Sequence, residues 1–547
     1  MKINIKKFFT VAAAASVLTA CIGDLNTLPL NESDVTSETA YGNDPQGYIQ
    51  GLTKIYFQLV SNSTQNLISG LDGGASEFIR AFWSTQEVTA DAVKCAWRDP
   101  WVNDLNKGTW KGDVTNDAVY SVYVRTLQSV AYVNEYLRQT APAALESRGV
   151  SAELAAAIEG YRAEARFLRA YFYWAAMDTF GQVPFSTEDS PFGGGYVPAQ
   201  KPAAEIFQYC VSELEYLASA ESAMPAAQSN YPRADKGSCL GLLARLYLNA
   251  EVYTGKAMWA EAKTTCERIY ALGYALAPTH AELFRGDNGE NPDARKEFLF
   301  AAAYDAENTQ SYGGTSYLTL STLNGNDGST LLNGVNGGWA GNRVPYGYVQ
   351  NFFKDVQNPD YTAGTYDYTD LRASYFHIKD REESMEGEFG LSTFLCGWSC
   401  IKYNNIPHDK TAAEFEATAK IKSFSDIDFP LIRLGEIHLI YAEACMHVGG
   451  SAAEQLNALT ARANASAPST VTEEWLMAER ARELMWEGHR RTDLIRYNKW
   501  ISGYDWTYKG GVFEGTDFPS HFNLFPVPYI ELTANLELNQ NPGYKGR

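Results

Sequence analysis

One cysteine near the N-terminus has the surroundings of a thiol that becomes acylated. Cys21 follows a basic start and the apolar run 8–18, which is shorter than the roughly 20 residues that a membrane-spanning helix needs. Small residues end this run at Leu18-Thr-Ala-Cys21, as at the cleavage site of an export signal. The pattern predicts a lipoprotein signal over 1–20, with Cys21 lipidated as the first residue of the mature chain. The alternative is an export signal with an incidental cysteine.

The other sulfur and titratable groups form no recognisable catalytic or metal motif. Seven cysteines remain besides Cys21, and an odd number does not suit a disulfide framework. Cys396 and Cys400 form the only close pair, and they are either bridged in an oxidising compartment or two ordinary buried thiols. No zinc-binding His-Glu-x-x-His pattern, nucleophile elbow or phosphate loop is present. The 65 acids leave open the paired carboxylates of a glycosidase.

One acidic loop is a candidate cation site. The segment 287–293, which begins at Asp287 and ends at Asp293, is rich in oxygen ligands, as calcium loops are. It lacks the full spacing of a helix–loop–helix calcium site. We interpret it as a plain acidic turn, with a structural calcium ion near Asp287 as the alternative. No other cofactor is expected.

The net charge excludes polyanionic partners. The formal charge is -20, and loss of Lys2, Lys6 and Lys7 with the signal takes away three positive charges and brings it to about -23. Such a field repels phosphate backbones, anionic lipid headgroups and polyanionic glycans, so nucleic-acid binding is not expected. A neutral ligand is indifferent to net charge. No later stretch is long and apolar enough to cross a membrane, which predicts a body held by its lipid anchor alone.

Helical patterns dominate about 115–271 and about 429–500. Ala163, Phe167, Ala170 and Trp174 follow one another at steps of four, three and four, which places them on one helical face. Small alanines that alternate with large rings are typical of closely packed helices. The pattern predicts a mostly α fold of helical hairpins stacked as in tetratricopeptide repeats.

Two blocks, about 71–110 and about 283–425, have a different character. They are rich in Gly, Asn, Asp and Tyr, which is typical of turns and irregular loops. Loops mounted on a rigid scaffold commonly carry function. No Pro/Ser-rich or singly charged linker divides the chain. We therefore expect 21–547 to be one domain, in which a helical platform carries two loop-rich blocks.

A charged block near the C-terminus favours a structural role. Its acids and bases lie three or four residues apart, a spacing at which opposite charges pair on a helix, and Gly488 is a candidate helix stop. We interpret the block as a network that fixes the fold, consisting of Glu483, Glu487, Arg490, Arg491 and Asp493.

Several segments resemble the SusD/RagB family of surface glycan-binding lipoproteins. The most specific is Glu479-Arg-Ala-Arg-Glu-Leu-Met-Trp-Glu-Gly-His-Arg-Arg-Thr-Asp-Leu-Ile-Arg. The others are 162–174, 180–185, 233–237, 243–250, 428–444 and 525–544. The resemblance implies a mostly helical single domain with tetratricopeptide-like hairpins, no enzymatic activity, and a lipid anchor in the outer membrane. It also implies a partner, a SusC-like TonB-dependent transporter that the lipoprotein covers as a lid.

Within the family, the chain is most similar to the starch-binding type, which presents a curved set of aromatic side chains to an α-glucan. The segments that would supply the three rings contain Trp97, Tyr312 and Trp339. Arg80 matches a polar contact of that type. The resemblance therefore implies that these four residues bind malto-oligosaccharide.

The sequence departs from that type at one end of the site. Cys95 stands where a second aromatic residue is expected, and Pro100 stands where an asparagine is expected. The neighbouring Asp99, Trp101 and Asn103 are our candidates for sugar contacts there.

The physics of a sugar site supports these residue types. An aromatic ring is a rigid apolar platform for the C–H face of a pyranose. Each sugar hydroxyl that is buried without a partner costs roughly 1–3 kcal/mol. Asn, Asp and Arg supply paired donors and acceptors, and Arg80, Asp99 and Asn103 are candidates for that role. Rings set in an arc would select a curled α-1,4-glucan over a flat, cellulose-like chain.

The structural alternative is that each ring belongs to the core, as most of the 12 Trp and 34 Tyr do. Their loop context, together with the resemblance, favours the binding role. We expect a non-catalytic receptor that captures starch or malto-oligosaccharides and delivers them to the transporter. The alternatives are a receptor of the same type for a different neutral glycan, a glycosidase, and a peptide-binding helical scaffold.

Overall fold

The computed structural model describes residues 40–546 except 63–70, 72, 192, 194, 325–331, 388–389 and 419–421. The predicted signal 1–20 and the predicted lipidation site Cys21 lie outside the described residues. A search of the described part finds no helix with the length and apolar character needed to cross a membrane.

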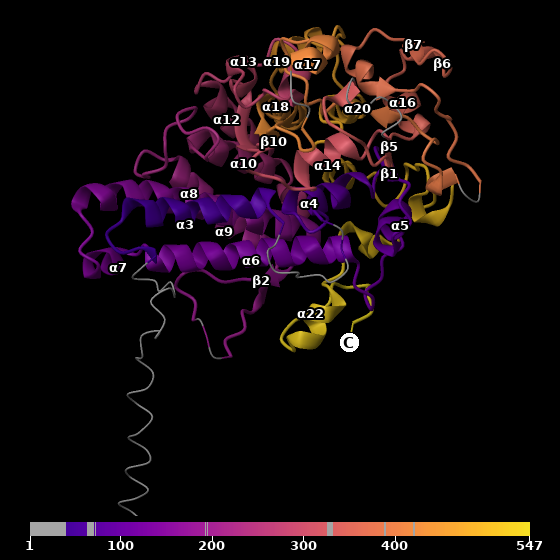
Figure 1. Cartoon of the computed structure of the whole chain (residues 1–547). Coiled ribbons are helices and arrows are strands. Elements are labelled where there is room, and N and C mark those ends of the chain that lie inside the picture. Colours follow the sequence, from indigo (N-terminus) through magenta and orange to yellow (C-terminus); the bar gives the residue numbers. More distant parts are fainter. Residues whose placement is uncertain are drawn as a thin grey trace, which may run out of the picture.

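The scaffold is a row of helices, most of which pack on the next one along the chain (Figure 1). Its main helices are α6 (Asp117–Gln139), α8 (Ala152–Phe180), α9 (Ala203–Ala218), α10 (Lys236–Leu248), α12 (Trp259–Tyr270), α18 (Leu434–Val448) and α20 (Glu473–Glu483). Helix α6 packs on α8, α8 on α9, α9 on α10, α10 on α12, α12 on α18, and α18 on α20. This order confirms the predicted mostly helical fold with stacked hairpins.

Helix α8 is buried on every side over its second half. The Ser151 hydroxyl accepts a hydrogen bond from the Leu154 N–H at 3.2 Å at its start, and Gly181 ends it with a φ of 71°. The predicted face of α8 is buried, but so are all the residues 167–180 on every side. The helix therefore has neighbours all round, and this stretch is apolar apart from Arg169, Asp178 and Thr179.

Helices also form where the sequence predicted loops. The block 71–110 contains α4 (Phe78–Glu87) and α5 (Pro100–Lys107). All ten residues of α4 are buried, including its polar residues, although its sequence is amphipathic; the sequence analysis missed this short helix. Helix α5 begins with a proline, a residue favoured at the first helical position. These two helices correct the prediction that this block is loop-rich throughout.

The second block, 283–425, is an insertion between α12 and α18, which pack directly on each other. Its strands, with two from elsewhere in the chain, form two-stranded antiparallel pairs. The pairs are β1 (Lys94–Cys95) with β5 (Asn342–Arg343), β4 (Phe298–Ala302) with β10 (Phe429–Arg433), β6 (Gln357–Asp360) with β7 (Thr365–Asp367), and β8 (Phe376–His377) with β9 (Ser399–Cys400). Its short helices include α13 (Pro292–Arg295), α14 (Gly314–Leu320), α16 (Tyr346–Phe352) and α17 (Ala412–Thr418).

The remaining elements flank the scaffold. Asp44 caps the N-terminus of helix α3 (Pro45–Val60), because its carboxylate accepts a hydrogen bond from the Gln46 N–H at 3.0 Å. Helix α3 packs on α6 and α8. The other elements are α7 (Pro142–Ser147), α11 (Ala250–Thr254), α19 (Ala453–Ala461), α21 (Arg490–Arg496), α22 (Tyr529–Ala534), β2 (Val183–Pro184) and β3 (Gln200–Lys201).

One large hydrophobic core joins the scaffold to both inserted blocks. It contains Phe167 of α8, Trp83 of α4 and Trp398, which precedes β9. The loops that carry the candidate site residues are therefore fixed to the helices by buried contacts.

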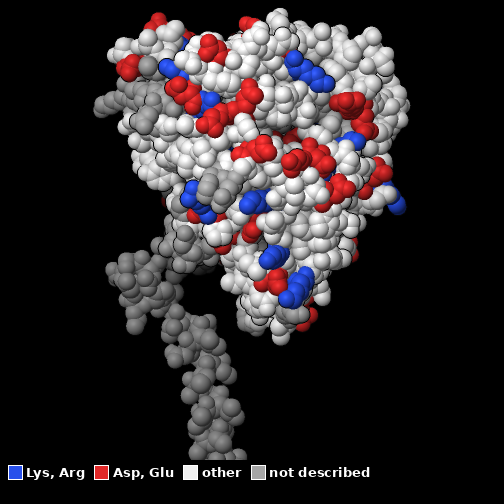
Figure 2. Space-filling view, turned by 90° about the vertical axis from the view of Figure 1, so that its right-hand side faces the viewer, with Lys and Arg blue, Asp and Glu red and all other residues white. Residues whose placement is uncertain are grey.

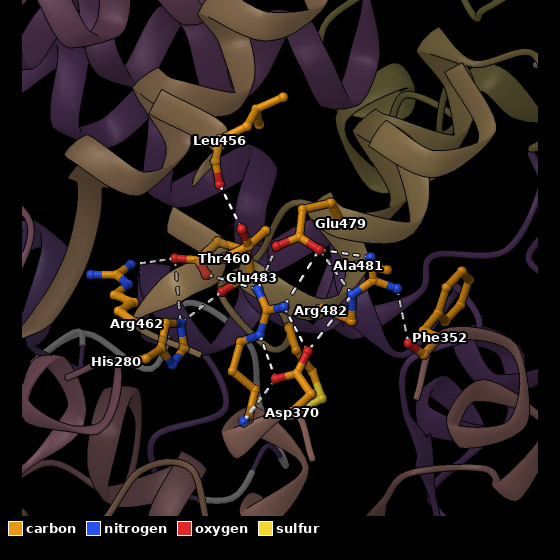
Figure 3. A network of polar contacts seen from close by, with 12 residues as sticks. His280, Phe352, Asp370, Leu456, Thr460, Arg462, Glu479, Ala481, Arg482 and Glu483 are labelled. Carbon is orange, nitrogen blue, oxygen red and sulfur yellow. Dashed lines mark hydrogen bonds and ion pairs between the residues drawn. The ribbon is translucent and has the colours of Figure 1, made fainter. Parts of the chain in front are cut away.

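The charged block at the end of α20 is buried and ion-paired, as predicted. Figure 3 shows contacts around one of its members, Glu483. Glu483 pairs with Arg372 at 3.0 Å, with Arg433 at 2.7 Å, and with Arg462. Glu487 pairs with Arg433 at 2.7 Å and with Lys402 at 2.6 Å. These partners come from distant parts of the chain, so the predicted helical spacing does not explain them.

The rest of the block also pairs with distant residues, although Asp493 additionally pairs with Arg496 three residues on, at 2.9 Å. Arg490 pairs with Asp91 at 2.7 Å, and Asp493 pairs with Arg480 at 2.8 Å. Gly488 has a φ of 81° and lies in the turn between α20 and α21, five residues after α20 ends. The network joins α20 and α21 to both inserted blocks.

Candidate functional site

Two of the predicted rings flank the β1–β5 pair, and the third precedes α14. Strand β1 pairs antiparallel with β5, with Cys95 opposite Asn342. Trp97 follows β1 and Trp339 precedes β5, so both leave the same end of the pair. The next residues continue the pairing, because the Ala96 N–H donates to the Gly341 carbonyl at 2.8 Å.

The rings are close together and partly open to solvent. The Tyr312 and Trp339 ring centroids are 5.7 Å apart, with 65° between the planes. Tyr312 is 46% exposed, whereas Trp97 and Trp339 are half-buried. Trp97 packs 6.0 Å from Tyr317, a buried ring of α14, the helix that Tyr312 precedes. Tyr312 and Trp339 therefore contact each other at a partly open surface. The half-buried Trp97 instead contacts Tyr317 and Arg80.

Arg80 links Trp97 to the turn that carries Tyr312. It is 2% exposed, and its guanidinium lies 4.3 Å from the Tyr317 ring centroid and 5.6 Å from that of Trp97. Its Nη1 donates to the Tyr312 carbonyl at 3.3 Å. These contacts position the rings, while a direct bond from Arg80 to a sugar hydroxyl stays a prediction.

Two glycines let the chain pass close to the rings. Gly341 has a φ of +117°, and a Cβ there would lie 2.6 Å from the Trp97 indole. Gly74 has a φ of +96°, and a Cβ there would lie 2.2 Å from the Tyr312 backbone. Only glycine combines this backbone conformation with such close approach.

A buried carboxyl group, which the sequence analysis missed, holds the turn that carries Tyr312. Glu77 contacts Ser311 through a hydroxyl hydrogen bond, and its Oε1 accepts from the Tyr304 hydroxyl at 2.5 Å. The Ser311 hydroxyl in turn accepts from the Gly313 N–H at 2.9 Å. Burial raises the pKa of Glu77 to about 8, against the opposing effects of these hydroxyls, Arg125 and Arg80.

The end of the site at which the sequence departs from the starch-binding type is the start of α5. Asp99 is exposed and precedes this helix, and the Asn103 N–H donates to the Asp99 carbonyl at 3.0 Å. The Trp101 ring is half-buried and packs against the core. Pro100 occupies the first position of the helix. The predicted sugar contacts of Asp99, Trp101 and Asn103 rest on their nearness to Trp97 along the chain, and they stay predictions.

Cys95 belongs to β1 and not to the open surface. It is 2% exposed, and burial raises the pKa of its thiol to about 11. Its backbone is fixed by Asn106 of α5, whose Oδ1 accepts from the Cys95 N–H at 2.8 Å and whose Nδ2 donates to the carbonyl at 2.7 Å. This residue pair sets the position from which Trp97 extends.

Phe424 is a fourth ring that the sequence analysis missed. It is half-buried, and its ring centroid lies 4.9 Å from that of Tyr312. One signal could have identified it, because Phe424 is a lone aromatic residue between Ser423 and Ser425 at the end of the loop-rich block.

The acidic loop 287–293 does not converge on a cation. The Asp287 Oδ2 lies 2.6 Å from His408 Nδ1, and Asp293 pairs with Lys296 at 2.8 Å. The potential metal ligands beside Asp287 are His408 and Asp409, and a calcium ion prefers oxygen ligands to an imidazole. These contacts favour the acidic turn over the calcium site. Cys396 and Cys400 are both free thiols in the structure.

The fold and the site together define a class of protein. Stacked helical hairpins form a rigid scaffold, and loops inserted between them carry a cluster of partly exposed aromatic side chains. Known proteins are similar to this chain both in sequence and in fold.

A family model described as the SusD family matches residues 395–544. The starch-binding protein SusD of Bacteroides thetaiotaomicron is 31% identical to this chain, and the match covers 99% of each. A SusD-like protein of Bacteroides ovatus is 21% identical, over 92% of this chain and 84% of that protein. The chain therefore belongs to the SusD family.

Solved structures show the same fold. A SusD superfamily protein from Bacteroides vulgatus has a TM-score of 0.67 at 20% identity, over 92% of this chain and 100% of that one. Surface glycan-binding protein A from Bacteroides thetaiotaomicron, in complex with laminarihexaose, has a TM-score of 0.64 at 17% identity, over 91% and 99% of the two chains.

Proposed function

We propose that this protein is a non-catalytic surface receptor that captures starch and malto-oligosaccharides. The observation that carries the proposal is the Tyr312–Trp339 pair, two loop-borne rings that meet at 65° and are partly open to solvent. Rings inclined to each other suit the curled face of an α-1,4-glucan better than a flat chain. The likeness over nearly the whole chain to a protein named for starch binding supports the same ligand.

The carboxyl group at the base of the Tyr312 turn is not placed to act as a glycosidase acid. A glycosidase needs two carboxyl groups that flank the scissile bond. Glu77 is fully buried, and both of its oxygens are hydrogen-bonded to Tyr304 and Ser311. It therefore supports the turn and does not face a sugar. Binding without cleavage is instead supported by the family to which the chain belongs.

The proposal includes the protein's place in the cell. The chain would be anchored in the outer membrane through a lipid on Cys21, with 21–547 forming one domain. It would deliver its glycan to a SusC-like TonB-dependent transporter. The family to which the chain belongs supports this arrangement, and the core shared by scaffold and insertions supports the single domain.

The test is calorimetry with maltoheptaose, combined with chromatography of the sugar after incubation. We expect heat of binding and no shorter products. Trp97→Ala, Tyr312→Ala and Trp339→Ala should each weaken binding by about 1–2 kcal/mol, or about five- to thirtyfold, through loss of a stacking surface. Tyr216→Ala is the matched control, because Tyr216 is 45% exposed on α9 and Tyr312 is 46% exposed.

The outcomes separate the candidate functions. Release of maltose or glucose would show an enzyme. Unchanged affinity in all three ring variants would remove the site assignment. The second candidate function is a receptor for a different neutral glycan, since a solved structure with this fold holds laminarihexaose. Binding of laminarihexaose or cellohexaose as tight as that of a malto-oligosaccharide of equal length would overturn the preference for α-1,4-glucan.

A further inference from the structure

Phe424 stands beside the predicted rings, on a segment that no sequence motif connects with them. Its ring centroid lies 4.9 Å from that of Tyr312, with 40° between the planes. Tyr312 thus contacts two rings, Trp339 on one loop and Phe424 on another. Since consecutive ring planes are inclined by 65° and 40°, the three rings form no flat platform.

The backbone around Phe424 is held in place from both ring-bearing loops. The Lys422 carbonyl accepts from the Asn336 N–H at 2.9 Å, which joins it to the loop of Trp339. The Ser425 N–H donates to the Ser316 hydroxyl at 3.0 Å, which joins it to α14, next to Tyr312. A further bond runs from the Thr315 hydroxyl to the Ile427 carbonyl at 2.8 Å.

These bonds make Phe424 a pre-positioned side chain. A loop that is already ordered loses little conformational entropy when a ligand binds to it. Phe424 remains half-buried and not fully covered, although it has no polar atom to present to water. A bare phenyl ring offers a sugar its apolar face and no hydrogen bond, which is the contact that a C–H face needs.

We propose that Phe424 is a further binding residue of the glycan site and lengthens its apolar platform beyond Tyr312. This inference rests on the proposed function. Because Phe424 enlarges the platform at its Tyr312 end, long chains reach it and short chains bound at Trp97 and Trp339 do not. Phe424 thereby gives the site a preference for longer glucan chains.

The experiment compares maltotriose with maltoheptaose by calorimetry, using Phe424→Ala and wild type. We expect Phe424→Ala to weaken maltoheptaose binding about two- to tenfold and to leave maltotriose binding unchanged, since only the longer chain covers the extra ring. Phe424→Tyr keeps the ring and should retain the wild-type affinity for both sugars. Phe57→Ala on α3 is the matched control, a phenylalanine that is 39% exposed on the scaffold.

Two results would overturn the inference while the proposed function stands. One is equal maltoheptaose affinity in Phe424→Ala and wild type when Trp339→Ala has lost affinity. The other is an equal loss for both sugars, which would mean that Phe424 only supports Tyr312. Absence of binding of either sugar to wild type would instead refute the proposed function, and this inference with it.

Discussion

The turn that carries Tyr312 is held by a fully buried carboxyl group. Glu77 is 0% exposed and bridges the hydroxyls of Tyr304 and Ser311. Arg80 and Arg125 lie near enough to lower its pKa, but burial outweighs them and raises it to about 8. At neutral pH the group is therefore mostly protonated, and the turn is held by neutral hydrogen bonds.

This raised pKa makes the stability of the protein depend on pH in a defined direction. The unfolded chain releases the Glu77 proton near the ordinary pKa of 4.5, and the folded chain releases it near 8. The contribution to stability is therefore complete below about pH 4.5 and is lost as the pH rises to about 8. Each unit of difference between the folded and unfolded pKa changes the free energy of unfolding by about 1.4 kcal/mol.

We expect Glu77→Gln, which cannot ionise, to lack this pH dependence. The melting temperature of wild type minus that of the variant should fall between about pH 5 and pH 9, measured by thermal unfolding. Glu514→Gln, a change at an exposed carboxylate, should give a constant difference from wild type. A constant difference for Glu77→Gln as well would mean that Glu77 is ionised throughout this range.

The sequence identifies the aromatic rings of the site better than the residues that contact them and hold them in place. Trp97, Tyr312 and Trp339 stand in Gly- and Asn-rich segments, and a family resemblance extends over each of them. Phe424 and Glu77 join the cluster through contacts with residues more than 100 positions away. Local composition does not indicate such contacts, so they could be identified only from the fold.

At the scale of elements, the scaffold was predictable because its helices repeat locally. Helices α8 and α10 show runs of small and large apolar residues, and they pack mainly on helices near them in the chain. Helix α4 is amphipathic but only ten residues long, and the sequence analysis missed it between Gly-rich segments. The pairing of β1 with β5 joins residues about 250 positions apart, and two-residue strands have no pattern of their own.

The ion network at the end of α20 holds the inserted block to the scaffold (Figure 3). Glu483 is fully buried, and the nearby Arg462 and Arg433 are among the charges that keep its pKa well below the ordinary value. Its stabilising effect is therefore fully present at neutral pH and is lost only in strong acid. Of the partner arginines, Arg372 lies within the insertion, and Arg433 and Arg462 follow it.

We expect Glu483→Gln to destabilise the protein by about 3–5 kcal/mol, because buried arginines lose a charged partner. Chemical unfolding at neutral pH measures this change. Glu514→Gln serves again as the exposed control and should change stability by less than about 0.5 kcal/mol. Equal stability of Glu483→Gln and wild type would show that the network contributes no net stabilisation.

The whole molecule carries a strong negative charge, which acts on any ligand that approaches the site. The formal charge is -20. Figure 2 shows that Asp and Glu outnumber Lys and Arg on the face that forms the right-hand side of Figure 1, where α5, β1 and β5 lie. Asp99, next to Trp97 in this region, is exposed. The field around the candidate site therefore repels anions and does not act on uncharged sugars.

This field predicts how salt affects binding. The affinity for neutral maltoheptaose should be constant between about 20 and 500 mM salt, because the ligand has no charge to be screened. A sulfated maltoheptaose should bind more weakly than the neutral sugar at low salt, and its affinity should rise as salt screens the repulsion. Calorimetry across the salt series measures both ligands. Tighter binding of the sulfated sugar at low salt would mean that local cations such as Arg80, and not the net charge, govern the approach of ligands.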